Sequence, residues 1–91
     1  MKKYTNIKAA ALKYEAYKDL APKIIAKGKG EVAKKIIQKA KEFDIPMFQN
    51  EVLVDSLLKV KDETIPPELY KAVVEVFVWL YNLEDKIKMS K

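Results

Sequence analysis

Two patterns in this chain combine residue types that could do chemistry: a glycine loop flanked by lysines, and pairs of adjacent carboxylates. The loop reads Lys27-Gly28-Lys29-Gly30 and precedes an amphipathic segment. Backbone N–H groups at the start of a helix can bind an anion, and neighbouring amines would assist. However, the spacing matches neither common phosphate-binding loop, and Glu31 would repel an anion. We therefore predict a tight turn between a strand and a helix, with a weak anion site as the alternative.

The carboxylate pairs are Asp62 with Glu63 and Glu84 with Asp85, in a connection and at a helix end. Catalytic carboxylate pairs need a shared pocket that separates their pKa values, and the neighbouring sequence supplies none. The chain also has no cysteine and no histidine, which excludes disulfides, thiolate nucleophiles, imidazole bases and Cys/His zinc sites. We expect solvated charges here, a protein that is not an enzyme, and no cofactor.

Lysine supplies all eighteen basic residues, and most of them lie in the first half of the chain. Residues 1–41 hold twelve lysines against three acidic residues, a net charge of +9, whereas residues 42–91 have a net charge of −4. Clustered lysines can neutralise phosphates, so a nucleic-acid- or anion-binding protein is the alternative function. The absence of arginine and of a recognition motif argues against it. The basic candidates for a partner surface are Lys8, Lys13, Lys27 and Lys29.

The segments that must position these residues predict a small α/β fold. Residues 7–14 are ambiguous, because their alanines favour a helix while their alternation would suit a strand, and the residues alone favour the helix slightly. A β-branched run at 23–26 predicts a strand, and residues 30–43 have the apolar spacing of a helix. With a second short strand at 46–49, these segments form a βαβ unit with parallel strands.

Two further helices are predicted in the second half of the chain. Asn50 is a good N-cap for a helix at 50–60, and Pro67 suits the first turn of a helix at 66–84. The last helix is apolar over a wider arc than contact with one core requires. It either lies in a groove between other elements or presents its Trp79 side to another protein.

Together these segments predict one α/β domain over residues 1–91, with residues 1–6 flexible. The expected architecture is a small mixed β-sheet of three to four strands wrapped by three to four helices. The longest apolar run, residues 72–83, contains polar residues and is shorter than the roughly 20 residues that cross a membrane. We therefore expect a cytoplasmic protein without a membrane span.

Several segments resemble those of one known family. They are Ala-Leu-Lys-Tyr at 11–14, Ala-Pro-Lys-Ile-Ile-Ala-Lys-Gly-Lys-Gly at 21–30, and Ile-Pro-Pro-Glu-Leu-Tyr-Lys-Ala-Val at 65–73. In this order they resemble the cytoplasmic C-terminal domain of the FlhB/YscU proteins of flagellar and type III export, over about residues 9–83. The resemblance implies a mixed sheet wrapped by helices, in which residues 7–14 form a strand rather than a helix.

The resemblance also implies a function. Members of that family carry membrane helices before this domain and cut themselves between Asn and Pro of an Asn-Pro-Thr-His loop, which switches the class of exported substrate. Here the corresponding position reads Tyr4-Thr5-Asn6-Ile7, without the Pro and the His, and no membrane helix precedes it. The chain looks like the fragment that cleavage would leave. We expect a non-catalytic interaction module of the export apparatus, with apparatus proteins or export substrates as its partners.

The family's strand before the cleaved loop is also missing from this sequence. Its loss would leave an unpaired sheet edge at residues 7–14. That edge could accept a strand from another chain, or from a second copy in a homodimer, unless Lys2, Lys3 and Lys8 protect it. The candidate partner surface therefore combines the lysines named above with Trp79.

Overall fold

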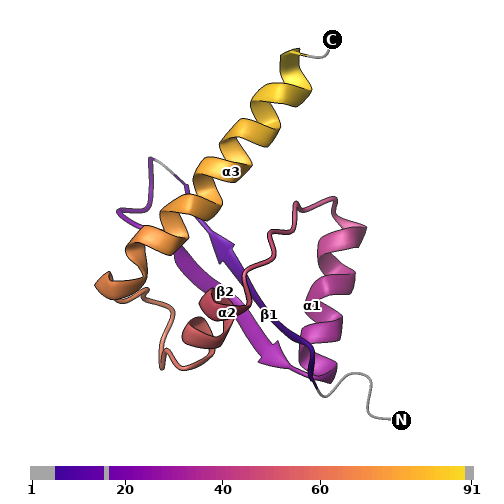
Figure 1. The fold of residues 1–91 in the computed structure, drawn as a ribbon, viewed down its shortest axis with the longest axis vertical. Helices are drawn as coiled ribbons and strands as arrows, with labels where there is room; N and C mark the ends of the chain where they lie inside the picture. Colours follow the sequence, from indigo (N-terminus) through magenta and orange to yellow (C-terminus); the bar gives the residue numbers. More distant parts are fainter. Residues whose placement is uncertain (1–5, 16, 90–91) are drawn as a thin grey trace.

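The computed structural model describes residues 6–15 and 17–89, so the segment 1–6 that we predict to be flexible lies outside it except for Asn6. Within these residues, a two-stranded sheet is followed by three α-helices, with a 3₁₀ turn before the last of them (Figure 1). The elements in chain order are β1 (Lys8–Lys13), β2 (Lys23–Lys29), α1 (Glu31–Glu42), α2 (Glu51–Leu58), η2 (Pro67–Leu69) and α3 (Tyr70–Met89).

The two strands form an antiparallel hairpin. The register pairs Lys8 with Lys29 and shifts by one residue after Ala11, which leaves Ile25 of β2 as the extra residue of a β-bulge. Residues 7–14 thus contain a strand, as the resemblance implies and contrary to the slight preference for a helix. Cross-strand pairing, with Ala9 buried on one face of β1 and Ala10 and Leu12 packed on the other, outweighs the helix propensity of its alanines.

The predicted parallel strand at 46–49 is wrong, and so are the βαβ unit and the mixed sheet of three to four strands. The connection between α1 and α2 is irregular over these residues, and the sheet described by the structure is the antiparallel hairpin alone. A segment forms a β-strand only when its backbone pairs with an adjacent strand. Pro46 has no N–H group to donate to such a strand. Met47, in the same segment, leaves about half of its side chain exposed.

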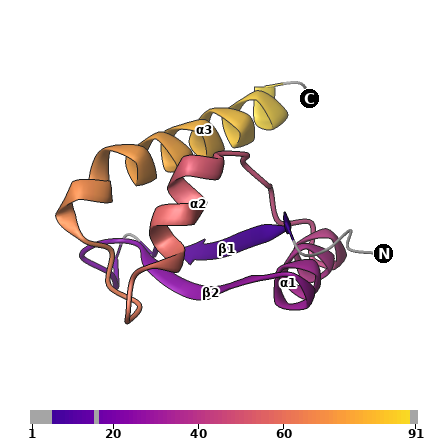
Figure 2. The same cartoon turned by 60° about the horizontal axis from the view of Figure 1, so that its bottom comes forward.

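Helices pack on the hairpin from different sides. Figure 2 shows α2 and α3 stacked over the hairpin, while α1 lies at the end where β1 begins and β2 ends. Small residues let α1 approach closely, because Ala33 of α1 and Ala9 of β1 are buried and Gly28 lies against Val32. The main core joins β2, α2, α3 and the connection between the two helices; its buried residues are Ile24, Leu53, Leu57, Ile65 and Val73.

The first two helices begin where their capping residues predict. Oδ1 of Asn50 accepts a hydrogen bond from the N–H of Leu53 at 3.0 Å, so α2 has the predicted N-cap. Gly30 precedes α1 with a φ of 59°, a value that favours glycine, and Glu31 places a negative charge at the positive end of the helix dipole. Both predicted helices are confirmed.

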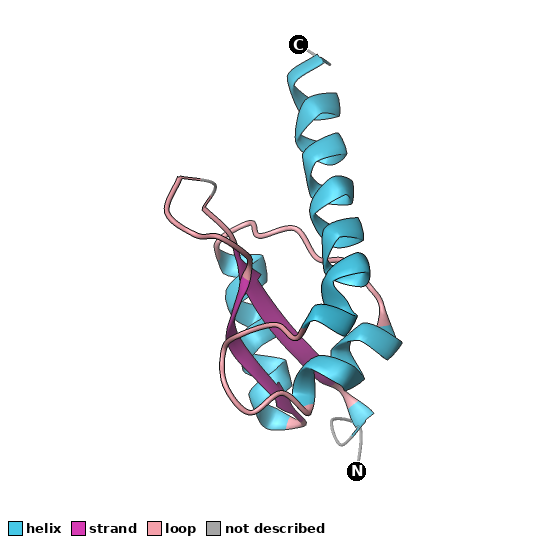
Figure 3. Cartoon of the chain, turned by 90° about the vertical axis from the view of Figure 1, so that its left-hand side faces the viewer, coloured by secondary structure: helices cyan, strands magenta, loops and turns pink. Residues whose placement is uncertain are grey.

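The last helix is confirmed and is longer than predicted. It follows the η2 turn at Pro67 and runs to Met89, past the predicted end at residue 84. Figure 3 shows its C-terminal part projecting beyond the rest of the fold. Among the helices described, none combines the length and the apolar character needed to cross a membrane.

Substituting Gly28 by alanine is expected to destabilise the packing of α1 on the hairpin. A Cβ at this position would lie 2.3 Å from Cγ1 of Val32, whose branched side chain has few rotamers to choose from. Overpacking of this kind costs about 1–3 kcal/mol of unfolding free energy. Urea unfolding of Gly28→Ala should show the loss, and adding Val32→Ala should recover part of it. An unchanged midpoint in Gly28→Ala would contradict this view of the contact.

Candidate docking surface

Lys8 of β1 forms an ion pair with α2. Its Nζ donates a hydrogen bond to Oδ1 of Asp55 at 2.8 Å, across 47 positions of the sequence. The hydrogen bond to Asp55 and the negative charge of that carboxylate raise the pKa of the Lys8 amine above its ordinary value. Lys8 therefore helps to hold the hairpin against α2, and its amine is already engaged.

The pair of Lys8 with Asp55 predicts a pH dependence at the alkaline end. Because folding raises the pKa of Lys8, its contribution to the free energy of unfolding is complete below the ordinary value of 10.5. The contribution is lost as the pH rises through the folded-state pKa. The melting temperature of the wild type should therefore fall more steeply above pH 10.5 than that of Lys8→Met. Equal slopes would contradict the ion pair.

Lys27 of β2 also reaches α2, at the opposite end of that helix. Its Nζ donates hydrogen bonds to the carbonyl oxygens of Leu57, at 3.1 Å, and of Val60. The last carbonyl groups of a helix lack partners within the helix, and a lysine amine satisfies them with favourable charge. Lys27 thus caps the C-terminal end of α2 and is directed away from the loop in which the sequence placed it.

The glycine loop itself is a turn rather than a phosphate cradle. Strand β2 continues through Lys29, so that Gly28 lies in the sheet and the turn begins only at Gly30. The N–H of Gly30, one of the donors that an anion would need, already bonds to the carbonyl of Ile7 at 2.9 Å. With the Lys27 amine on the α2 side as well, the geometry favours the predicted turn over the anion site.

Trp79 packs against the connection between α1 and α2. Its ring centroid lies 5.2 Å from that of Phe48, with the rings tilted by 58°. A second aromatic contact joins α3 to the residue that follows β1: the rings of Tyr14 and Phe77 meet edge to face, with their centroids 5.9 Å apart. Trp79 is therefore half-buried within the chain, which agrees with the groove interpretation more than with full presentation to a partner.

Between residues 70 and 84, the most exposed apolar side chains of α3 lie on its other side. Val74, Val78 and Tyr81 are 56%, 53% and 69% exposed, whereas Val73 is buried. These three residues, spaced by four and three positions, form one stripe, which we call the outer face of α3. The wide apolar arc of this helix in the sequence indicates that some apolar residues stay exposed. It does not predict which side of the helix packs against the core.

Lys13 and Lys29 are exposed, but they lie at opposite ends of the hairpin. The five sequence candidates therefore do not form one patch. Two of the lysines stabilise α2, two are exposed at separate ends of the sheet, and Trp79 packs on Phe48.

The structure describes three of the four paired carboxylates, including Asp62 and Glu84. Asp62 and Glu84 are exposed, and Oδ1 of Asp62 accepts a hydrogen bond from the N–H of Thr64 at 2.9 Å, as in a turn. Within the residues that the structure describes, no cluster of three or more acidic side chains could hold a metal ion.

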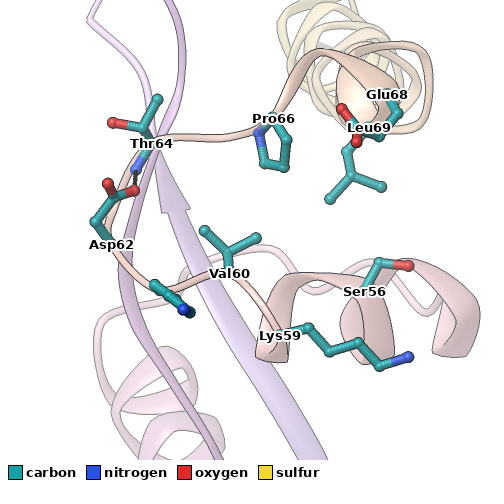
Figure 4. A pocket seen from close by; sticks show the side chains of 9 residues that line it. Ser56, Lys59, Val60, Asp62, Thr64, Pro66, Glu68 and Leu69 are labelled. Carbon is teal, nitrogen blue, oxygen red and sulfur yellow. Dashed lines mark hydrogen bonds between the residues drawn. The ribbon is translucent and has the colours of Figure 1, made fainter.

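A shallow hollow of about 520 Å³ lies between the end of α2 and η2 (Figure 4). Val60, Pro66 and Leu69 give it an apolar lining, while the Lys59 side chain extends away from it. Ligand sites usually combine an apolar cavity with a few convergent polar groups. The polar side chains drawn here do not converge on a common point, so we assign no ligand to this hollow.

Comparison with known sequences identifies relatives of this chain. A profile of the FlhB HrpN YscU SpaS Family matches residues 6–80. YlqH of Bacillus subtilis, described as uncharacterized, is 42% identical over 93 residues, and the match covers the whole of both chains. The flagellar biosynthetic proteins FlhB of Aquifex aeolicus and Bacillus subtilis are 37% and 38% identical over 81 residues, which is 87% of this chain. The chain spans 23% and 22% of those two proteins, less than a quarter of their length.

A solved structure extends the likeness to the fold. The crystal structure of the PscU C-terminal domain superimposes with a TM-score of 0.76 at 29% sequence identity. The match covers 81% of this chain and 96% of that domain. This chain belongs to the FlhB HrpN YscU SpaS family, and its α/β fold resembles a C-terminal domain of that family.

Proposed function

We propose that this chain is a non-catalytic interaction module of the flagellar or type III protein export apparatus, which replaces or modulates the switch domain of a full-length relative. The observation that carries the proposal is the extent of the match to the PscU C-terminal domain, 96% of which is covered by this chain. A partner that recognises such a domain would meet a similar surface here. Its partners would be apparatus proteins or export substrates in the cytoplasm.

The chemistry of the surface supports binding rather than catalysis. The outer face of α3 offers apolar contact area, which is typical of protein-binding sites. Lys13 and Lys29 add exposed positive charge at the two ends of the hairpin. The sequence offers no cysteine or histidine for nucleophilic or acid–base chemistry.

The proposal can be tested by complementation in Bacillus subtilis. A strain whose FlhB is truncated before its C-terminal domain should regain secretion of flagellar proteins when this chain is supplied as a separate protein. In a strain with intact FlhB, overproduction should change the proportions of the secreted flagellar proteins. Mass spectrometry of the culture medium measures both effects.

The control for complementation is Val73→Asp, which should not fold and should restore no secretion. If the wild-type chain accumulates as folded protein yet changes secretion in neither strain, the proposal is wrong. Retention on duplex DNA that falls steeply with salt, in the absence of any effect on secretion, would favour the nucleic-acid alternative.

The purified chain is expected to remain intact during incubation at neutral to mildly alkaline pH. The family's cleavage requires Asn followed by Pro, whereas Asn6 is followed here by Ile7. The Ile7 carbonyl also accepts a hydrogen bond from the N–H of Gly30, which holds the start of β1 in the hairpin. Intact-mass spectrometry should show one species. A stoichiometric break after Asn6 would contradict the expectation; a relative that carries the Asn-Pro-Thr-His loop is the positive control.

A further inference from the structure

The outer face of α3 lies between charges of opposite sign. Glu68 of η2 and Lys71 of α3 come before its three apolar residues, and Asp85 and Lys88 of α3 come after them. Successive positions of this series are three or four residues apart, the spacing that places residues along one side of a helix. From its N-terminal end, the stripe is therefore acidic, basic, apolar, acidic and basic.

This order of charges is complementary to itself in one orientation only. If two copies of the helix lie antiparallel with Val78 at the centre, position 71 of one copy lies beside position 85 of the other, and position 68 lies beside position 88. Each of these pairs joins a lysine to a carboxylate, and symmetry repeats both pairs. Parallel helices in register would instead place Lys71 opposite Lys71 and Asp85 opposite Asp85, which is unfavourable.

The N-terminal part of this stripe is open to solvent. Glu68 and Lys71 are exposed, as are the apolar residues of the outer face, and neither charge forms an ion pair with another described residue. Figure 2 shows α3 as the layer of the fold furthest from the hairpin, with α2 between them. A second copy can therefore approach the outer face from the solvent side.

The C-terminal half of α3 extends past the main core. The residues of α3 that belong to the core or pack against it all lie in the first half of the helix: Ala72, Val73, Val76 and Phe77. Figure 3 shows the helix continuing beyond the rest of the fold. Helices in proteins gain most of their stability from packing. In the antiparallel pair, this end of α3 would lie against the first turns of the other copy's α3.

We propose that two copies of this chain associate through the outer faces of α3, which pack antiparallel across a two-fold axis near Val78, so that each Lys71 lies beside Asp85 of the other copy. The apolar residues form the centre of the interface, and the charges at both ends fix its orientation and register. One pair of helices buries less surface than the about 1,600 Å² typical of stable complexes, so we expect a dissociation constant in the micromolar range.

The dimer goes beyond the proposed function and has a consequence for it. The second copy would cover the outer face, so a partner that binds there must displace it, and the local concentration of the chain would control access. The test uses the purified chain alone, whereas the proposed function is tested by secretion. Either proposal can therefore fail without the other.

Exchanging charges tests the orientation of the pair. Sedimentation equilibrium of the full chain should show a monomer–dimer equilibrium. Lys71→Glu would bring two carboxylates together at each end, and Asp85→Lys would bring two amines together, so each should raise the dissociation constant by about tenfold or more. The double variant restores opposite charges and should dimerise as the wild type does. Unchanged single variants, or a double variant that does not recover, would overturn the antiparallel arrangement.

Cysteine cross-linking tests the register. The chain has no cysteine of its own, so each substitution reports one position. Val78→Cys places two thiols near the two-fold axis, where oxidation by copper phenanthroline should couple them into a disulfide-linked dimer. Val74→Cys is the matched control, because its two positions would lie about 12 Å apart along the antiparallel helices, too far for a disulfide. The proposal is wrong if the wild type stays monomeric well above micromolar concentration, or if Val74→Cys couples as readily as Val78→Cys.

Discussion

Replacing Leu57 by alanine should lower the free energy of unfolding by about 2–5 kcal/mol. Leu57 is 2% exposed and contacts the core that joins β2, α2 and α3, so its truncation removes apolar burial and leaves a cavity. A domain of this size has a total stability of about 5–15 kcal/mol, so the variant should lose a large share of its stability. Thermal unfolding followed by circular dichroism measures the effect.

The matched control lies on the same helix. Val52 is 77% exposed, and Val52→Ala should change the stability by no more than about 0.5 kcal/mol. Similar melting temperatures for Leu57→Ala and Val52→Ala would show that α2 does not pack on the hairpin as described.

Placing a carboxylate at Val73 should unfold the chain. Val73 is 2% exposed on the core side of α3, and the buried residues of its cluster are all apolar. An unpaired charge in a core costs about 3–5 kcal/mol, comparable with the whole stability of a small domain. Val73→Asp should therefore lose the sharp thermal transition and the dispersed NMR spectrum of the wild type.

The neighbouring residue provides the control. Val74 is 56% exposed on the outer face of α3, so Val74→Asp should fold with nearly wild-type stability. If partners dock on that face, this variant should also lose function in the complementation assay while it remains folded. Equal stability of the two variants would contradict the assignment of inner and outer sides to α3.

The helices could be predicted from the sequence because their signals are local. Apolar spacing marks α1, and the side chain of Asn50 marks the start of α2 within a single turn. For α3 the sequence predicts the element but not its orientation. Val73 and Val74 are equally apolar, and only the packing of the whole chain decides that one is buried and the other exposed.

The sheet could not be predicted in the same way, because strand pairing depends on residues that are distant in sequence. The alanine-rich β1 is a strand only because β2 pairs with it, and the apolar residues near Pro46 are not a strand because no described strand lies beside them. The contact of Lys8 with Asp55 spans 47 positions, and no local pattern encodes it. The contact of Lys27 with the carbonyl of Leu57 is also distant in sequence, and the residues next to Lys27 suggested a loop instead.

The β-bulge at Ile25 limits how the length of β2 can change. In a regular strand, residues three positions apart face opposite sides of the sheet. Ile24 and Lys27 nevertheless both reach α2, through the core and through the helix carbonyls, because the bulge inserts one residue between them. Deleting Ile25 would turn one of these two contacts away from the helix, whereas many substitutions at Ile25 would preserve both. Over evolutionary time, this stretch of the family should accept changes of residue type far more readily than insertions or deletions.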